Sequence, residues 1–154
     1  MTATGNVALL TEPEPVTNNT LIATGETLVF EEGLFGFPEC RSFALHRTDH
    51  RGLFWLQSTE HEALSFLLVD PFLYFDGYSV DLAEPDVERL APRASSDIAI
   101  LTTVTIAESG EQTSTTNLQG PIAINVRTGQ ARQIIVSDPD YSVRHPIDLA
   151  ASHD

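Results

Sequence analysis

Lysine is absent from this 154-residue sequence, and all eight basic residues are arginines. Twenty-two aspartates and glutamates oppose them, so the formal net charge is −14. A surface this acidic repels phosphate backbones and anionic lipid headgroups. The composition therefore argues against direct nucleic-acid binding and against binding to a membrane surface.

Cysteine and long apolar runs are also scarce. Cys40 is the single cysteine, so a disulfide within the chain is excluded, as is a zinc site built on cysteines. The longest apolar-leaning stretch, residues 98–107, contains three threonines and is far shorter than the roughly 18 residues of a membrane-spanning helix. The first arginine is Arg41, so the N-terminus lacks the positive start of a secretory signal. We expect a cytoplasmic protein.

Motifs of catalysis are missing too. The sequence contains no glycine-rich phosphate loop and no Gly-x-Ser-x-Gly elbow. Cys40 and His46 suggest a thiol and its base, but Glu39 beside the thiol disfavours its ionisation. We therefore predict no enzyme, no catalytic residue, no metal and no cofactor.

Two alternatives remain open. His46, His50 and His61 occur within one short region, which suits a small metal-dependent hydrolase, although their spacing matches no familiar ligand pattern. A ligand-binding β-barrel is the other alternative, with aromatic side chains lining a cavity.

The chain divides into three parts. Residues 1–22 have no apolar period and contain Pro13 and Pro15, so we predict a flexible N-terminal extension. A single β domain is expected over residues 26–147, followed by a C-terminal tail over residues 148–154.

Short runs of aromatic and β-branched residues alternate with turn formers through this domain. The predicted strands are 28–30, 43–46, 54–57, 66–69, 98–106, 122–126 and 134–136. In 98–106 the even positions place four apolar residues on one face, Ile98, Ile100, Val104 and Ile106, which predicts a strand buried on one face only. Trp55 is expected in the core.

One short helix is predicted over residues 85–91. Pro85 is tolerated in a first turn, Asp86 complements the helix dipole, and Pro92 ends the element. Val87 and Leu90 share a face and should pack on the sheet. The predicted fold class is all-β: a small antiparallel barrel-like or coiled sheet with this single helix.

Two segments are candidates for binding a protein partner. Residues 69–82 interleave aromatic side chains with aspartates, which suits an arginine- or lysine-bearing partner. The candidate residues there are Asp70, Asp76, Tyr78 and Asp81. A second candidate group, in residues 115–125, comprises Asn117, Pro121 and Asn125, although bracing of the backbone is an alternative role for its two asparagines.

The chain resembles the FliW family of bacterial flagellar assembly factors in the ordered pieces 33–39, 54–58, 66–72, 78–82, 98–106, 116–118, 120–125 and 141–146. Among them are Gly33-Leu34-Phe35-Gly36-Phe37-Pro38-Glu39 and Phe66-Leu67-Leu68-Val69-Asp70-Pro71-Phe72. Phe35 stands where the family motif often has proline.

The resemblance implies a monomeric, non-catalytic, barrel-like protein with two mutually exclusive partners. One is flagellin, bound in the cytoplasm before its export. The other is CsrA, the RNA-binding repressor of flagellin translation, which such proteins antagonise by a non-competitive route. The acidity fits this expectation, because an anionic protein attracts a basic RNA-binding protein.

Overall fold

The computed structural model describes residues 14–19, 22, 24–107 and 113–150. The strands in this part are β1 (Thr27–Phe30), β2 (Ser42–Arg47), β3 (Leu53–Ser58), β4 (Ser65–Val69), β5 (Ile98–Thr105), β6 (Thr115–Thr116), β7 (Ile122–Asn125), β8 (Gln130–Gln133) and β9 (His145–Pro146). The α-helix is α1 (Glu84–Leu90), and two 3-10 turns are η2 (Pro71–Leu73) and η3 (Ser95–Asp97).

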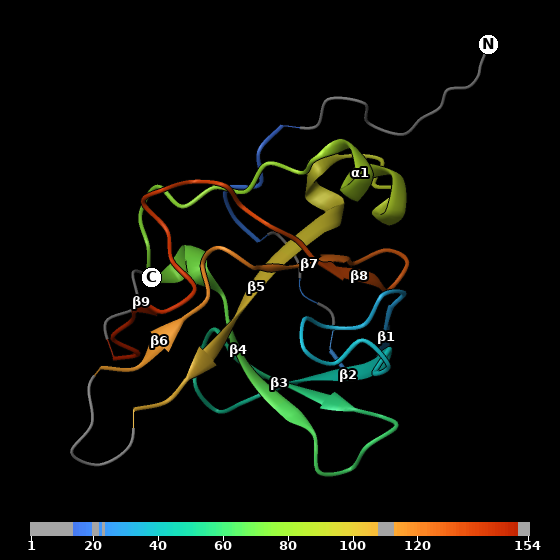
Figure 1. Ribbon diagram of the computed structural model, residues 1–154, viewed down its shortest axis with the longest axis horizontal. Helices are drawn as coiled ribbons and strands as arrows, with labels where there is room; N and C mark the ends of the chain where they lie inside the picture. Colours follow the sequence, from blue (N-terminus) through green and yellow to red (C-terminus); the bar gives the residue numbers. More distant parts are fainter. Residues whose placement is uncertain (1–13, 20–21, 23, 108–112, 151–154) are drawn as a thin grey trace.

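The sheet closes on itself (Figure 1). Its strands follow the order β4-β3-β2-β1-β8-β7-β5, and β5 pairs back with β4. All neighbours are antiparallel except β1 and β8, which are parallel. The short strands β6 and β9 extend the sheet beside the end of β5. The predicted all-β, barrel-like fold with one helix is confirmed.

Alternating side chains fill the barrel. Phe43 and Leu45 of β2 and Phe54 and Leu56 of β3 point inward, as the two-residue period of a strand requires. By the same alternation Trp55 points outward and is 46% exposed, so its prediction as a core residue is wrong.

A second apolar layer covers the outer side of β5. Ala99 and Leu101 belong to the barrel interior, whereas Ile98 and Ile100 pack in a separate cluster with residues of α1 and of the chain before it. The prediction that this strand is buried on one face only is therefore wrong. Ile106, predicted on the buried face, lies beyond the strand and is 50% exposed.

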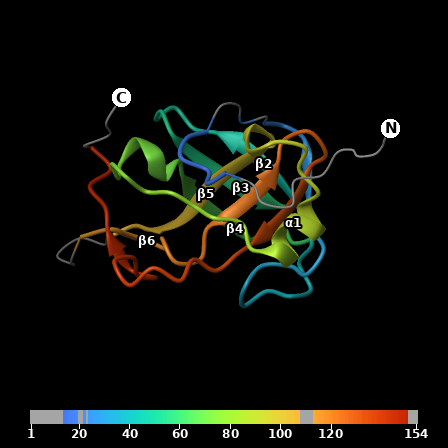
Figure 2. The ribbon, with the colours of Figure 1, turned by 90° about the horizontal axis from the view of Figure 1, so that it is seen from above.

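The helix packs beside β8 (Figure 2). Its bounds differ by one residue from the prediction, and Val87 and Leu90 are buried as predicted. Ala91 has a φ of +50° and ends the helix in the left-handed conformation before Pro92.

Two predicted boundaries differ from the structure. Within the predicted extension, Val16 is buried and exchanges two backbone hydrogen bonds with Val80. Residues 14–19 are thus part of the domain, while residues 1–13 lie outside the described residues. Residues 134–136, predicted as a strand, form none. The strand in this region is β8, which pairs with β1 and β7. Its sequence is mostly polar, so the pattern of apolar residues did not predict it.

Candidate functional site

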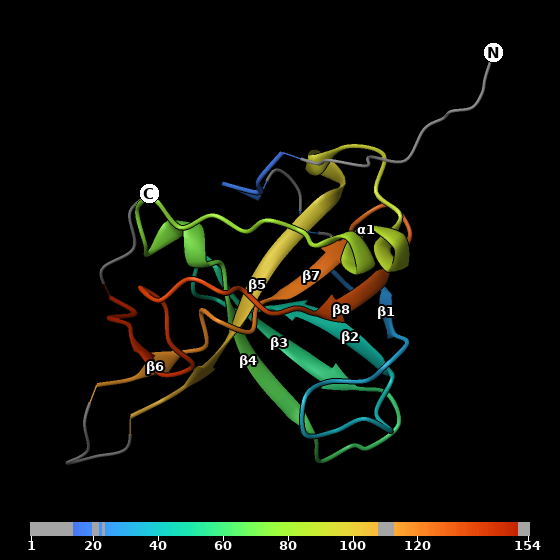
Figure 3. The same ribbon diagram turned by 45° about the horizontal axis from the view of Figure 1, so that its top comes forward.

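Strands β4 and β5 diverge beyond the point where they pair (Figure 3). A groove opens between them. The two strands pair only at Leu68 with Thr103 and Val69 with Thr102, although β4 begins at Ser65 and β5 continues to Thr105. The groove has a volume of about 370 Å³. Its lining residues are Leu34, Phe35, Ser65, Phe66, Leu67, Thr103, Val104, Thr105, Asn117 and Gln133.

Aromatic side chains are exposed at this groove. Phe35 in its wall is 55% exposed, and Phe37 beside it is 37% exposed. The Phe37 ring meets Phe66 edge to face at 5.4 Å, and Phe66 in turn lies 6.2 Å from the buried ring of Phe43. Exposed aromatic rings supported by a packed core are typical of protein-binding surfaces.

Two glycines shape the turn that carries Phe35. Gly33 and Gly36 have φ values of +70° and +88°, in the region that favours glycine. A Cβ atom on Gly33 would lie 2.5 Å from the carbonyl oxygen of Pro38, whereas Gly36 faces open space. Leu34 and Phe37 close the turn with two backbone hydrogen bonds. The turn therefore holds Phe35 outward.

Polar side chains connect this turn to the rest of the groove. Gln133 accepts a hydrogen bond from the Phe35 N–H at 2.9 Å through Oε1, and its Nε2 donates to the Gly120 carbonyl at 2.8 Å. Asn117 Oδ1 accepts from the N–H of Gly120 at 2.8 Å. The candidate residue Asn117 is thus half-buried at the groove, where it also orders the backbone.

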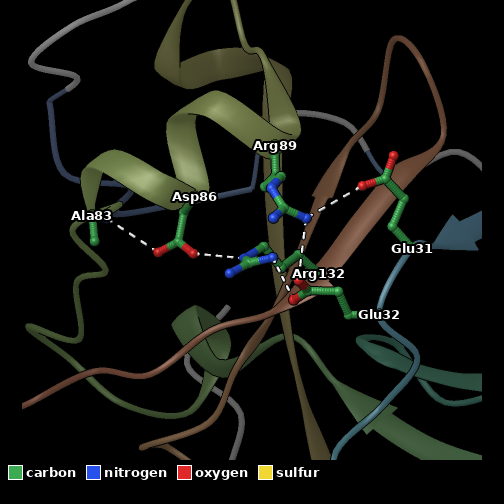
Figure 4. Close-up of polar contacts among 6 residues, drawn as sticks. All are labelled: Glu31, Glu32, Ala83, Asp86, Arg89 and Arg132. Atoms are coloured by element: carbon green, nitrogen blue, oxygen red, sulfur yellow. Dashed lines mark hydrogen bonds and ion pairs between the residues drawn. The ribbon is translucent and has the colours of Figure 1, made fainter. Parts of the chain in front are cut away.

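Ion pairs hold the two residues that precede this turn, Glu31 and Glu32 (Figure 4). Arg132 of β8 contacts Glu32 at 2.7 Å and Asp86 at 2.8 Å. Arg89 of α1 contacts Glu32 at 3.1 Å and Glu31 at 3.5 Å. This network fixes the chain that leads into Gly33, and it occupies two of the eight arginines with acidic partners.

Two residues of the first candidate group are buried. Tyr78 is 2% exposed and donates a hydrogen bond to the Leu118 carbonyl at 2.8 Å. Asp70 is 8% exposed, and its Oδ1 accepts from the Phe72 N–H at 3.0 Å at the start of η2. Burial raises the pKa of each of these two side chains. The prediction that Tyr78 and Asp70 lie on an exposed surface is wrong, because both side chains are buried and hydrogen-bonded to the backbone.

Two residues of the second group are buried as well. Asn125 is fully buried; its Nδ2 donates to the Leu90 carbonyl, and its Oδ1 accepts from Arg127 and Thr128. Pro121 is buried, and its carbonyl accepts from the N–H of Ile134. Both residues brace the backbone, so their prediction as partner-facing residues is wrong.

Asp76 and Asp81 are exposed. The structure does not place them at the β4–β5 groove; Asp81 lines a different groove, formed with residues 135–139. Sequence reasoning also missed Phe35, Phe37 and Gln133 as surface residues. The available signal was the pair of glycines flanking Leu34 and Phe35, which marks a turn that presents a side chain to solvent.

The histidines offered as metal ligands, His46, His50 and His61, are exposed. Among the residues that the structure describes, no group of three His, Cys, Asp or Glu side chains is placed to hold a metal ion. Cys40 is 4% exposed. Burial raises the pKa of its thiol, and the negative charges of Glu39 and Glu60 raise this pKa further. Within the same part of the chain, no helix is long and apolar enough to cross a bilayer.

This chain is similar in sequence and fold to known proteins. A family model described as "FliW protein" matches residues 16–147. The flagellar assembly factor FliW of Natranaerobius thermophilus is 34% identical over 121 residues, which cover 78% of this chain and 80% of the relative. The flagellar assembly factor FliW of Bacillus subtilis is 36% identical over 123 residues, which cover 79% of this chain and 85% of the relative. A crystal structure of the flagellar assembly factor FliW superposes with a TM-score of 0.73 and 31% identity, covering 86% of this chain and 96% of that one.

Proposed function

The chain belongs to the FliW family of flagellar assembly factors, and on that premise we propose that it binds flagellin in the cytoplasm and antagonises CsrA by partner switching. Binding of one partner excludes the other. Free flagellin then draws the factor away and releases CsrA onto its message, so that synthesis of the subunit follows its use. No covalent bond is made or broken in this cycle.

The exposed aromatic groove beside β4 and β5 is the observation that carries this proposal. Phe35 and Phe37 remain open to water although the barrel interior is closely filled. A subunit awaiting assembly has apolar surface that it later buries against its neighbours, and such surface needs an apolar partner in the meantime. We assign the groove to flagellin for this reason.

Charge supports the second partner. The net charge of −14 disfavours competition with CsrA for RNA, whose phosphates are themselves anionic. The same charge attracts a basic RNA-binding protein over distances of about 10 Å in 0.1 M salt. We place the CsrA contact on the acidic outer surface that includes Asp76 and Asp81.

Mixing the purified chain with flagellin and with CsrA from the same organism tests the proposal. We expect a stable complex with each at micromolar concentration and low salt, and displacement of CsrA when flagellin is added. Failure of both complexes to form contradicts the proposal.

A matched pair of variants tests the groove itself. Phe35→Ala should weaken the flagellin complex about tenfold or more, as expected for an aromatic anchor. Val143→Ala removes another exposed apolar side chain, 57% exposed, and should leave affinity unchanged. Equal affinities for the two variants would move the flagellin contact away from the groove.

A further inference from the structure

A second groove lies between two chain segments outside the barrel. The chain between η2 and α1 supplies Ser79 and Asp81, and the chain after β8 supplies residues 135–139. Figure 3 shows the course of the two segments. The groove has a volume of about 520 Å³ and is open to solvent.

The chain after β8 has backbone groups along this groove that are open to hydrogen bonding, as at the edge of a β-sheet. The N–H groups of Ile134 and Val136 donate to the carbonyls of Pro121 and Gln119. Because peptide groups alternate in direction along an extended chain, those of Ile135 and Ser137 face the other way, towards the groove. Neither residue makes a backbone hydrogen bond with any residue that the structure describes.

The opposite side of the groove is similar. Val80 directs both of its backbone groups to Val16, so the backbone groups of Asp81 point away from that pair. Asp81 likewise makes no backbone hydrogen bond with the part of the chain that the structure describes.

Side chains at the groove select a type of ligand. Ile135 is 69% exposed, the most of any large hydrophobic side chain among the described residues. Asp81 and Asp138 add two carboxylates, and no arginine is among the described residues that line the groove. An apolar contact flanked by negative charge suits a chain in which basic and apolar residues alternate.

We propose that an extended, lysine- or arginine-bearing segment of a partner polypeptide docks in this groove by adding a strand to the backbone edge of Ile135 and Ser137. Its basic side chains lie near Asp81 and Asp138, and an apolar side chain covers Ile135. Asp81 also belongs to the surface proposed above for CsrA. This inference goes beyond that function, because it assigns a backbone edge and defines the ligand by its chemistry alone.

A capped eight-residue peptide of alternating lysine and valine is the probe. Titrated into the isotope-labelled full chain, it should shift the amide resonances of residues 79–81 and 135–138 and saturate. A peptide of alternating glutamate and valine should not bind. Shifts confined to the β4–β5 groove, or an equal response to the glutamate peptide, overturn the proposal.

Variants separate this site from general attraction to an acidic protein. D81N combined with D138N should weaken the peptide about fivefold, whereas E39Q combined with E62Q makes the same change in net charge on exposed residues and should have little effect. Equal weakening by the two pairs overturns the proposal.

Backbone methylation tests strand addition directly. Methyl groups on alternate peptide nitrogens block one hydrogen-bonding edge of a strand. One of the two alternately methylated peptides should lose binding while the other retains it. If both bind equally well, strand addition is excluded. These measurements use neither flagellin nor CsrA, so their failure is distinct from failure of the proposed function.

Discussion

The side-chain amide of Asn125 donates from Nδ2 to the backbone carbonyl of Leu90 at 2.8 Å and so connects β7 to the last residue of α1. The same side chain accepts from Arg127 and Thr128 in the turn that follows β7. One fully buried polar residue therefore holds the helix, a strand and a turn together.

Asn125→Ala should lower the free energy of unfolding by about 3 kcal/mol, because the Leu90 carbonyl and the Arg127 N–H lose their side-chain partner. The Thr128 N–H keeps the backbone carbonyl of residue 125 as its acceptor. Urea denaturation monitored by circular dichroism measures the loss. Asn18→Ala, at an exposed position, is the control and should change little. A loss below about 1 kcal/mol would contradict the bracing role.

Gly33→Ala should destabilise the protein by about 3 kcal/mol or more, since a left-handed φ is combined with a clash against Pro38. Gly36→Ala has a similar φ and open space, so only the backbone cost of about 1–2 kcal/mol applies. Thermal unfolding compares the two variants. Equal destabilisation would show that the turn accommodates a Cβ at Gly33.

The stability contributed by Asp70 should depend on pH. Burial raises the pKa of its carboxyl group in the folded state, ahead of the opposing hydrogen bonds from Asn19 and Phe72 and the charge of Arg51. The folded protein then binds the proton more tightly than the unfolded chain. This contribution is fully present below pH 3.8, the ordinary value, and is lost as the pH rises through the higher folded-state pKa.

Asp70→Asn should therefore become more stable relative to the wild type as the pH rises from about 3 to 7. Denaturant midpoints at a series of pH values measure the difference. Asp76→Asn removes an exposed carboxylate and corrects for the change in net charge. A difference that is constant with pH, or that reverses, would falsify the assignment.

Charge reversal at the exposed aspartates tests the proposed CsrA contact. Asp76→Arg with Asp81→Arg should weaken the CsrA complex about tenfold at low salt and reduce its dependence on salt. Glu39→Arg with Glu62→Arg makes the same change in net charge elsewhere. Isothermal titration at two salt concentrations compares the pairs, and an unchanged affinity in the aspartate pair places the contact on another surface.

Local patterns were enough for most of the barrel. Alternating apolar residues and flanking turn formers predicted the strands at 43–46 and 54–57, because both features lie within a few residues of each other. The helix followed from Pro85, Pro92 and the spacing of Val87 and Leu90 for the same reason. Such patterns depend only on neighbouring residues, so they predict a strand or helix without knowledge of what packs against it.

The candidate site depended on contacts between distant parts of the chain. The groove is assembled from Phe35, Phe66, Val104, Asn117 and Gln133, which lie on five separate segments. Sequence patterns also placed Tyr78 on the surface and left two roles open for Asn125, partner binding and backbone bracing. The sequence does not show whether a polar group has a buried hydrogen-bond partner.

By itself the sequence determined the fold class, the short helix, the acidic character and the family of this protein. Only the tertiary structure decided which aromatic rings face water, that β5 is buried on both sides, and that β4 and β5 part to leave a groove. The physical reason is that alternation along a strand sets two faces, whereas the covering of each face depends on residues far away in the chain.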